Sequence, residues 1–291
     1  LFSAASPHIL PVDQRLEDAY SLSWTSAPLT DPVEILGYAN AHLHVSVDTD
    51  IAFLNVRLID VAPDGAAALV TKGVLNLTHR NSHETPTPLV PGQVYEVDVM
   101  LDATSWLFEP GHRIRISING ADYPNTWPSP MLYTGQIHVG PAQASRLTVP
   151  VVGPQTAALP TPQLLPPTPF ESAVSGYAER PIWRVTRDQM TGAAEVFISR
   201  TGTTRVNERC SFTSTSEAIT SVAEKDPAHA TIRGLSQVIL HWPERTIDTR
   251  ARGQIESDEK NFHVTIQLEI TMDGLPFHSR RWIKSIPRQL L

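Results

Sequence analysis

Apolar and polar residues alternate with a period of two over most of this 291-residue chain, and turn signals interrupt the alternation. Successive side chains of a β-strand point to opposite faces, so the alternation is typical of strands that bury one face. Helical periodicity is scarce. Many short strands separated by turns that contain Pro or Gly predict an all-β protein of the sandwich or barrel type.

Three segments in the first half show the alternation most clearly, and each predicts a strand with an inward-facing apolar set. These sets are Leu43, Val45 and Val47; Tyr95, Val97, Val99 and Leu101; and Ile114, Ile116 and Ile118. His42 and His44 alternate with the first set, which predicts that both imidazoles lie on a solvated strand face.

Residues 51–61 are apolar at positions on both faces, as expected of a strand buried in the middle of a two-layer sandwich. Pro63, Asp64 and Gly65 follow it and predict a tight turn, because Pro fixes φ and Gly tolerates positive φ. Residues 61–80 are therefore predicted to form a β-hairpin, in which an apolar run and a second turn precede Asn76. The Pro-Gly pairs at 91–92 and 110–111 each predict the start of a strand.

A concentration of proline marks the predicted domain boundary, because it favours an extended polyproline segment that packs no core. We expect a jelly-roll β-sandwich at residues 1–152, a Pro-rich linker at 153–172 and a second, mostly antiparallel β domain at 173–291. The second domain resumes the alternation and predicts a meander with one solvated face. Its only helix candidate is residues 226–235, where Asp226 is the predicted N-cap and Pro227 the first helical residue.

The composition of the chain argues against nucleic acid and membranes as binding partners. The formal net charge is −7, and no cluster of Lys and Arg with interleaved aromatics is present, so nucleic acid is not expected. No apolar run approaches the ~20 residues of a membrane helix, so no membrane partner is expected. The single cysteine, Cys210, excludes an internal disulfide and leaves open a buried small residue or a reactive thiol. The chain starts at Leu1 without a signal peptide, which indicates an excerpt of a longer protein and favours the cytoplasm.

The chemical motifs of the common enzyme classes are absent from the sequence. It contains no Gly-x-Ser-x-Gly elbow, no His-Glu-x-x-His, no phosphate loop and no Gly-x-Gly-x-x-Gly, so we expect no catalytic residue and no cofactor in this chain. His42 and His44 would need a third ligand from elsewhere to hold a metal, and the prediction is no metal site.

Three further polar or aromatic groups are weighed in the same way. Asp48 and Asp50 lack the continuation of a calcium loop and are interpreted as a polar turn. The carboxylates at 256, 258 and 259 are interpreted as a solvated turn rather than an acid/base pair. Tyr123 and Trp127 are aromatic residues of one loop, and internal packing, contact with a neighbouring domain and stacking on a sugar all remain open.

Several short motifs together make the first domain resemble a known family. Residues 20–37, 44–65, 73–80, 88–118 and 121–124 match, in order and spacing, the C-terminal domain of X-Pro dipeptidyl-peptidase and cocaine esterase-type (CocE/NonD) hydrolases. The residues of the resemblance that we single out are Asp60, Pro63, Asp64, Gly65, Gly111, His112 and Arg113. The second domain is similar, at residues 226–230 and 280–291, to extra C-terminal segments of members of the same hydrolase group.

The resemblance implies a jelly roll of the galactose-binding type, packed against an α/β-hydrolase domain that holds a Ser-His-Asp triad. None of the triad falls in the matching residues, so the partner expected is a catalytic domain of the same polypeptide that this chain lacks. A homodimer is kept open. The parent enzyme would hydrolyse an ester, or a peptide bond after proline, through an acyl-enzyme.

Within that family frame, His112 and Arg113 are interpreted as architectural. Arg113 and Arg115 are expected to pair with a carboxylate such as Asp60 or Asp102. Leu1 and Phe2, with Tyr123 and Trp127, are candidates for lining a cleft shared with the catalytic domain.

Two readings from different classes follow. The first is the non-catalytic C-terminal portion of a serine α/β-hydrolase, which buttresses the catalytic domain and shapes its substrate entrance. The alternative is a free-standing carbohydrate-binding jelly roll. The first predicts an exposed apolar patch where the catalytic domain docks.

Overall fold

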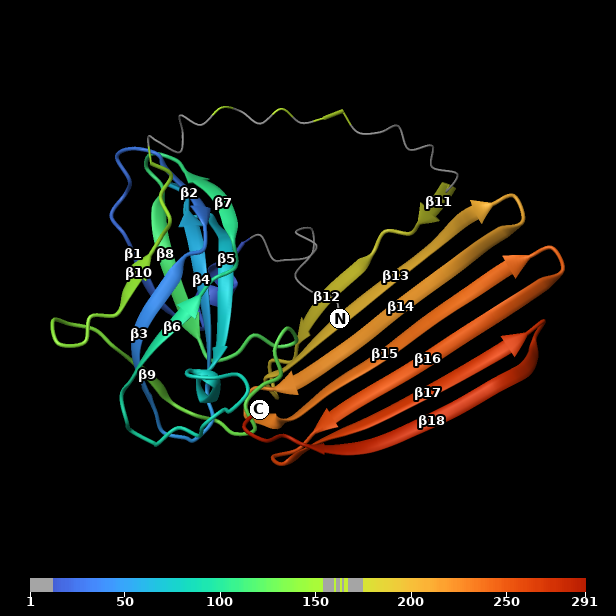
Figure 1. Ribbon diagram of the computed structural model, residues 1–291. Helices are drawn as coiled ribbons and strands as arrows, with labels where there is room; N and C mark the ends of the chain where they lie inside the picture. The colour runs from blue at the N-terminus through green and yellow to red at the C-terminus, as the bar shows by residue number, and fades with distance from the viewer. Residues whose placement is uncertain (1–12, 154–159, 161–162, 164, 167–174) are drawn as a thin grey trace. The chain divides into compact units, whose positions relative to one another are not determined.

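The computed structural model describes residues 13–153, 160, 163, 165–166 and 175–291, and strands make up most of it (Figure 1). The chain divides into two compact units. Unit 1 comprises Leu1–Ser129, Tyr133–Pro162 and Leu290–Leu291, and unit 2 comprises Pro130–Leu132 and Gln163–Gln289. The Pro-rich linker expected at 153–172 lies mostly outside the described residues.

Unit 1 is a jelly-roll β-sandwich. One antiparallel sheet has the strand order β1-β8-β4-β5, a second has the order β10-β3-β6 with β9 also paired to β3, and β2 pairs with β7. The elements are α1 (Arg15–Asp18), β1 (Leu22–Thr25), β2 (Val33–Gly37), β3 (Asn40–Val47), β4 (Phe53–Val61), β5 (Ala67–Asn76), the 3-10 helix η1 (Leu77–His79), β6 (Tyr95–Met100), β7 (Thr104–Phe108), β8 (Arg113–Asn119), β9 (Gly135–His138) and β10 (Arg146–Thr148).

The core lies between the two larger sheets, and the predicted inward sets form much of it. Every residue of β4 is buried, as the apolar pattern on both of its faces predicts. Leu43, Val97 and Ile118 come from three different strands and belong to one cluster of buried side chains. The predicted orientation of these strands is confirmed.

The first turn of the predicted hairpin is confirmed, and the second turn is wrong. Gly65 has φ +87° in the connection between β4 and β5, where a residue with a Cβ would be strained. The expected second turn is absent, since β5 continues without a break through Gly73, which pairs with Val56. A Cβ on Gly73 would lie 3.0 Å from the carbonyl carbon of Met100, so this glycine permits a close backbone approach rather than a turn.

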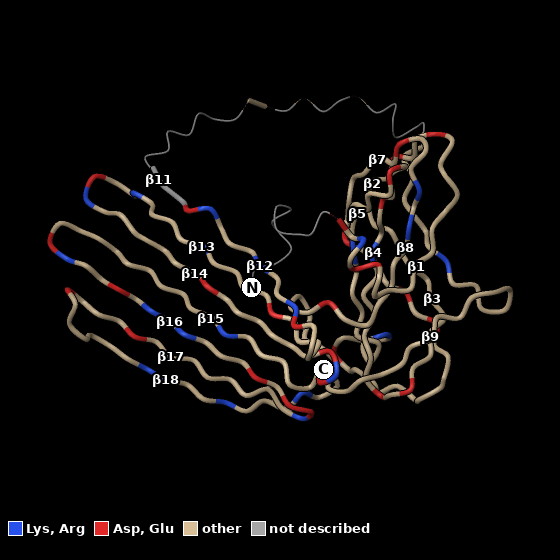
Figure 2. The backbone as a smooth tube through the Cα atoms, turned by 180° about the vertical axis from the view of Figure 1, so that it is seen from behind, with Lys and Arg blue, Asp and Glu red and all other residues tan. Residues whose placement is uncertain are grey.

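Unit 2 is one long antiparallel sheet, ordered β11-β13-β14-β15-β16-β17-β18, with β12 also paired to β13. Consecutive strands from β13 onward form hairpins, and Figure 2 shows charged residues at their turns. The strands are β11 (Ser175–Ala178), β12 (Ile182–Arg187), β13 (Ala193–Asn207), β14 (Cys210–Ala223), β15 (Asp226–Trp242), β16 (Arg245–Ser257), β17 (Asn261–Met272) and β18 (Leu275–Pro287).

The two faces of this sheet differ in chemistry, as the meander prediction requires. Paired residues of neighbouring strands share a face, and one row across six strands consists of Ile198, Ala218, Gly234, Gly253, Ile266 and Trp282. The row on the opposite face consists of Ser199, Glu217, Leu235, Arg252, Gln267 and Arg281. On the apolar face, Val264, Ile266, Trp282, Lys284 and Ile286 line a shallow hollow of about 320 Å³.

The helix predicted at residues 226–235 is wrong. These residues begin β15, in which Asp226 pairs with Ala223 of β14 and the residues from Thr231 onward pair with both β14 and β16. Ala230 is completely buried, and its backbone N–H donates to the Oγ of Ser257. Strand pairing on both sides of residues 231–235 and the Ser257 contact of Ala230 favour the extended conformation, and this tertiary contribution outweighs the local capping signal of Asp226 and Pro227. Within the described residues, no helix is both long and apolar enough to cross a bilayer.

Candidate functional site

Asp60 is the centre of a polar cluster at one end of the sandwich. Its Oδ1 lies 2.9 Å from the Nδ1 of His112, and its Oδ2 accepts a hydrogen bond of 3.0 Å from the indole N–H of Trp106. The Asp60 side chain is 7% exposed. Trp106 belongs to β7 and Asp60 to β4, so the carboxylate joins two sheets while His112 ties the turn before β8 to the same point.

Neither arginine contacts the predicted carboxylates Asp60 or Asp102 in the contacts that place them, although Arg115 does pair with a carboxylate, as the prediction required. Arg113 Nη1 donates to the backbone carbonyl of Ser26, and Arg115 Nη1 donates to Asp18 Oδ2 at 2.7 Å. Both carboxylate oxygens of Asp60 already have partners, Trp106 and His112. No sequence pattern indicates these contacts, because the three residues come from different strands or turns. Gly111, next to His112, has φ +84°.

Sequence reasoning missed a buried polar cluster around Arg57. This side chain is almost completely buried, and its guanidinium donates to Gln14 Oε1 at 2.9 Å and to the Oγ atoms of Ser21 and Ser117. Burial lowers the pKa of Arg57, because desolvation penalises its charged form. The available signal was an arginine inside a mostly apolar strand, and such a charge must find partners when the strand is buried.

The aromatic loop residues lie together. Tyr123 and Trp127 are both half-buried, and their rings pack edge to face with centroids 5.9 Å apart and an interplanar angle of 90°. Rings that are perpendicular and packed on each other do not form one flat platform for a sugar. Leu1 and Phe2, the other candidates for lining a cleft, lie outside the described residues.

The sandwich has an apolar groove at its open edge. Its lining includes Trp24 of β1, Ile116 of β8 and Val139 beyond β9, and its volume is about 240 Å³. β1 is the edge strand of its sheet, and all four of its residues, Leu22–Thr25, are exposed. The groove therefore lies where an uncovered strand borders the space between the two sheets.

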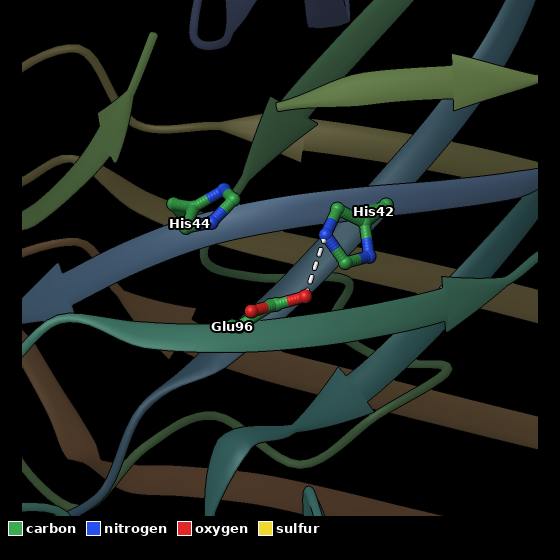
Figure 3. Close-up of side chains that lie close together, drawn as sticks. All are labelled: His42, His44 and Glu96. Atoms are coloured by element: carbon green, nitrogen blue, oxygen red, sulfur yellow. Dashed lines mark ion pairs between the residues drawn. The ribbon is translucent and has the colours of Figure 1, made fainter. Parts of the chain in front are cut away.

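The expected solvated face of β3 is wrong for the two histidines, since His42 is buried and His44 is half-buried. The structure brings Glu96 of β6 to them, and one ligand atom from each of the three residues lies within 4.8 Å of the others (Figure 3). His42 Nε2 is 3.0 Å from Glu96 Oε1, and His42 Nδ1 is 3.2 Å from Asp98 Oδ1. A hydrogen bond from Asn40 is the main cause of the lowered pKa of Asp98.

Of the remaining candidate carboxylates, Asp48 and Asp258 lie between strands, whereas Glu256 lies within β16 and pairs with Thr231 and His263, so the turn interpretation is wrong for Glu256. Asp258 connects β16 to β17, where its carboxylate accepts the backbone N–H groups of Lys260 and Asn261 and lies 2.7 Å from His263 Nε2. These contacts, led by His263, lower the pKa of Asp258 to about 2. Asp48 Oδ1 accepts the backbone N–H of Thr134 at 2.7 Å. Asp258 thus organises its own turn, in agreement with the turn interpretation, whereas Asp48 holds the backbone of a segment that is distant in sequence.

The fold is a jelly-roll β-sandwich followed by a second β domain, and polar contacts such as that of Asp60 with Trp106 join the strands of unit 1 to one another. Residues 2–148 match the model of the X-Pro dipeptidyl-peptidase C-terminal non-catalytic domain. The chain belongs to this family, which confirms the resemblance carried by its short motifs.

Curated relatives agree with this assignment. Cocaine esterase from Rhodococcus sp. is 34% identical over 161 residues, which cover 49% of this chain and 28% of the esterase. Proteins of Mycobacterium bovis and Mycobacterium tuberculosis, provisionally named serine esterases, are 34% identical over 170 residues, which cover 50% of this chain and 26% of theirs. A solved α-amino acid ester hydrolase is 26% identical with a TM-score of 0.46, over 48% of this chain and 27% of that one. The chain thus spans about a quarter of the length of the curated relatives it matches.

Proposed function

We propose that this chain is the C-terminal, non-catalytic portion of a serine α/β-hydrolase of the esterase or X-Pro dipeptidyl-peptidase type. In this proposal, the sandwich buttresses a catalytic domain of the same polypeptide and shapes its substrate entrance. The nucleophile, its histidine and its acid belong to the catalytic domain. The chain's own contribution is a rigid surface on which that domain packs.

The observation that carries the proposal is the uncovered apolar edge of the sandwich. Leu22 is 50% exposed, Trp24 is 39% exposed and Val139 is 63% exposed. Edge strands of monomeric proteins are usually protected by charged residues, proline or a covering segment, whereas Leu22–Thr25 contains no charged residue and no proline. An apolar groove beside such a strand is typical of a surface that another domain covers.

The Asp60 cluster supports the same proposal. A docking domain must hold its surface in one shape, and Asp60 fixes β4, β7 and the turn that leads into β8 to one another. Pro63, Asp64 and Gly65 form the turn that follows β4, in which Asp64 Oδ1 accepts the N–H of Ala66 at 2.9 Å. We therefore assign His112 and the turn residues a structural role in this surface and no contact with substrate.

The test of activity compares this chain with the longer natural polypeptide that contains it. Both are assayed with p-nitrophenyl esters and an X-Pro chromogenic amide, and both are treated with a fluorophosphonate that labels active serines. We expect turnover and labelling of the longer polypeptide only, and the ratio of the two turnover rates identifies the substrate class. Labelling of neither polypeptide would refute the hydrolase proposal.

The test of docking uses Trp24→Ser in the longer polypeptide, with Val90→Ser as the control. Val90 is an exposed apolar residue in a loop, 55% exposed, and does not line the groove. If the catalytic domain packs on the groove, Trp24→Ser accelerates heat inactivation of the esterase several-fold and Val90→Ser does not. Equal inactivation rates for both variants would show that the groove is not the docking surface.

A further inference from the structure

We propose that His42, His44 and Glu96 bind one divalent transition-metal ion, with Zn²⁺ as the ion whose chemistry fits them best. Two imidazole nitrogens and one carboxylate oxygen form a ligand set that zinc accepts, with a fourth position left for water. The inference does not depend on the proposed hydrolase function, because it concerns only residues of β3 and β6.

The backbone brings the three residues together. β3 and β6 are antiparallel neighbours, with His44 directly opposite Glu96 and His42 directly opposite Asp98. His42 and His44 are two residues apart on β3 and therefore share a face, on which directly opposed Cβ atoms are only about 5 Å apart. Rigid pairing thus fixes the positions from which all three side chains start.

The distances suit a small cation. A tetrahedral zinc with bonds of about 2.0–2.1 Å holds its ligand atoms roughly 3.4 Å from one another. His42 Nε2 and Glu96 Oε1 are already 3.0 Å apart, and the atom offered by His44 completes a group within 4.8 Å. Figure 3 shows the Glu96 carboxylate below and between the two rings. The proposal requires the side chains to rotate by the small amount that separates 4.8 Å from this spacing.

A carboxylate orients His42 as metal-binding histidines are usually oriented. Asp98 Oδ1 lies 3.2 Å from Nδ1 of His42, and Asn40 Nδ2 holds the same oxygen at 2.7 Å. A proton on Nδ1 directs the lone pair of Nε2 toward the site, because a neutral imidazole donates from one nitrogen only.

His44 supplies an independent observation. Its Nδ1 is buried and has no hydrogen-bond partner within the described part of the chain. Unpaired buried polar atoms are rare and indicate a missing partner such as an ion or water. The site is also accessible, since the side chain of Glu96 is 64% exposed. Arg146 lies opposite His42 on β10, and its positive charge repels a cation bound at the site.

The experiment titrates the full chain, freed of metal with a chelator, with Zn²⁺ in competition with a chromogenic chelator. We expect saturable binding of one Zn²⁺ per chain and a rise in thermal midpoint on binding. Binding should be lost in His44→Ala and in Glu96→Gln. Asp98→Asn should weaken it about 10- to 100-fold, because Asp98 positions His42 without contacting the ion. Co²⁺ in place of Zn²⁺ should give the intense visible absorption of a tetrahedral site.

The matched control is the double variant His79→Ala/His83→Ala. These histidines form a second imidazole pair, with ring centroids 5.4 Å apart, but no carboxylate joins them in a metal-sized group within the described residues. The control should bind Zn²⁺ like the parent chain. Glu96→Gln changes an exposed side chain, so its circular dichroism should match the parent and exclude a folding defect.

Two results would overturn the proposal. One is no saturable Zn²⁺ binding to the parent chain, which would leave the contacts of His42 with Glu96 and Asp98 as the explanation of the geometry. The other is binding that survives His44→Ala and Glu96→Gln and disappears in the His79/His83 double variant, which would assign the ion to the other pair.

Discussion

Replacing Asp60 by alanine removes the acceptor that Trp106 and His112 share, and it leaves a gap where two sheets meet. The indole N–H loses a hydrogen bond of 3.0 Å, and the imidazole loses a partner at 2.9 Å. Both groups lie in a partly dry environment, since the Asp60 side chain is 7% exposed and that of His112 is 23% exposed. Neither donor gains full access to water when the carboxylate is removed.

The expected magnitude follows from these two contacts. A buried donor left without an acceptor costs about 1–3 kcal/mol, and the partly exposed His112 costs less than Trp106, so the sum is roughly 2–5 kcal/mol. At about 2–4 °C per kcal/mol for a unit of this size, unit 1 should unfold roughly 5–15 °C lower. The unfolding temperature of Asp60→Asn should lie between those of the parent chain and Asp60→Ala, because an amide oxygen still accepts from Trp106.

The assay is thermal and urea unfolding of the full chain, followed by calorimetry and tryptophan fluorescence. Asp64→Ala is the control: it removes an aspartate four residues away whose exposed carboxylate makes one turn contact, at a cost of about 1 kcal/mol or less. A loss for Asp60→Ala no larger than that for Asp64→Ala would refute the view that Asp60 joins the sheets.

Three further outcomes are expected. Gly73→Ala should destabilise unit 1 by about 1–3 kcal/mol, because its Cβ meets the backbone of Met100 and Leu101, whereas Gly135→Ala, with only an ordinary contact to Val47, should not; equal urea midpoints would contradict this. Burial raises the pKa of Tyr133 from 10.0 to about 12, so its neutral hydroxyl contributes stability below pH 10 that is lost as pH rises to about 12. Between pH 10 and about pH 12, the parent chain should therefore lose roughly 3 kcal/mol of unfolding free energy that Tyr133→Phe does not lose, as measured by urea titration. Tryptophan fluorescence should not respond to added galactose or other sugars, because Tyr123 and Trp127 pack on each other; saturable quenching would restore the carbohydrate-binding alternative.

Local pattern predicted the interior of the sandwich because burial and strand period act residue by residue. Leu43, Val97 and Ile118 alternate with polar neighbours, and all three are in the core. Local signals failed where pairing outweighed them, as at Asp226 and Pro227, which have helix-capping chemistry but begin a strand that pairs with two neighbouring strands from Thr231 onward. They failed at Gly73 as well, where a glycine that resembles a turn signal permits backbone contact instead.

The candidate sites also combine residues that the sequence indicated with residues that only strand pairing brings to them. His42 and His44 were visible as a pair because they are two residues apart, but Glu96 is 52 positions beyond His44 and only strand pairing places it opposite. The family motif singled out both Asp60 and His112. It did not predict that they contact each other or that Trp106 donates to the same carboxylate.

The sequence by itself determined the all-β class, the inward faces of the strands, the Gly65 turn and the family, since each depends on residues that are neighbours in the chain or on motifs that match in order. The tertiary structure alone decided which polar groups meet: Asp60 with Trp106, Arg57 with Gln14, and Glu96 with the two histidines. Such contacts depend on register between strands that are distant in sequence, and a shift of one residue would send every one of these side chains to the other face.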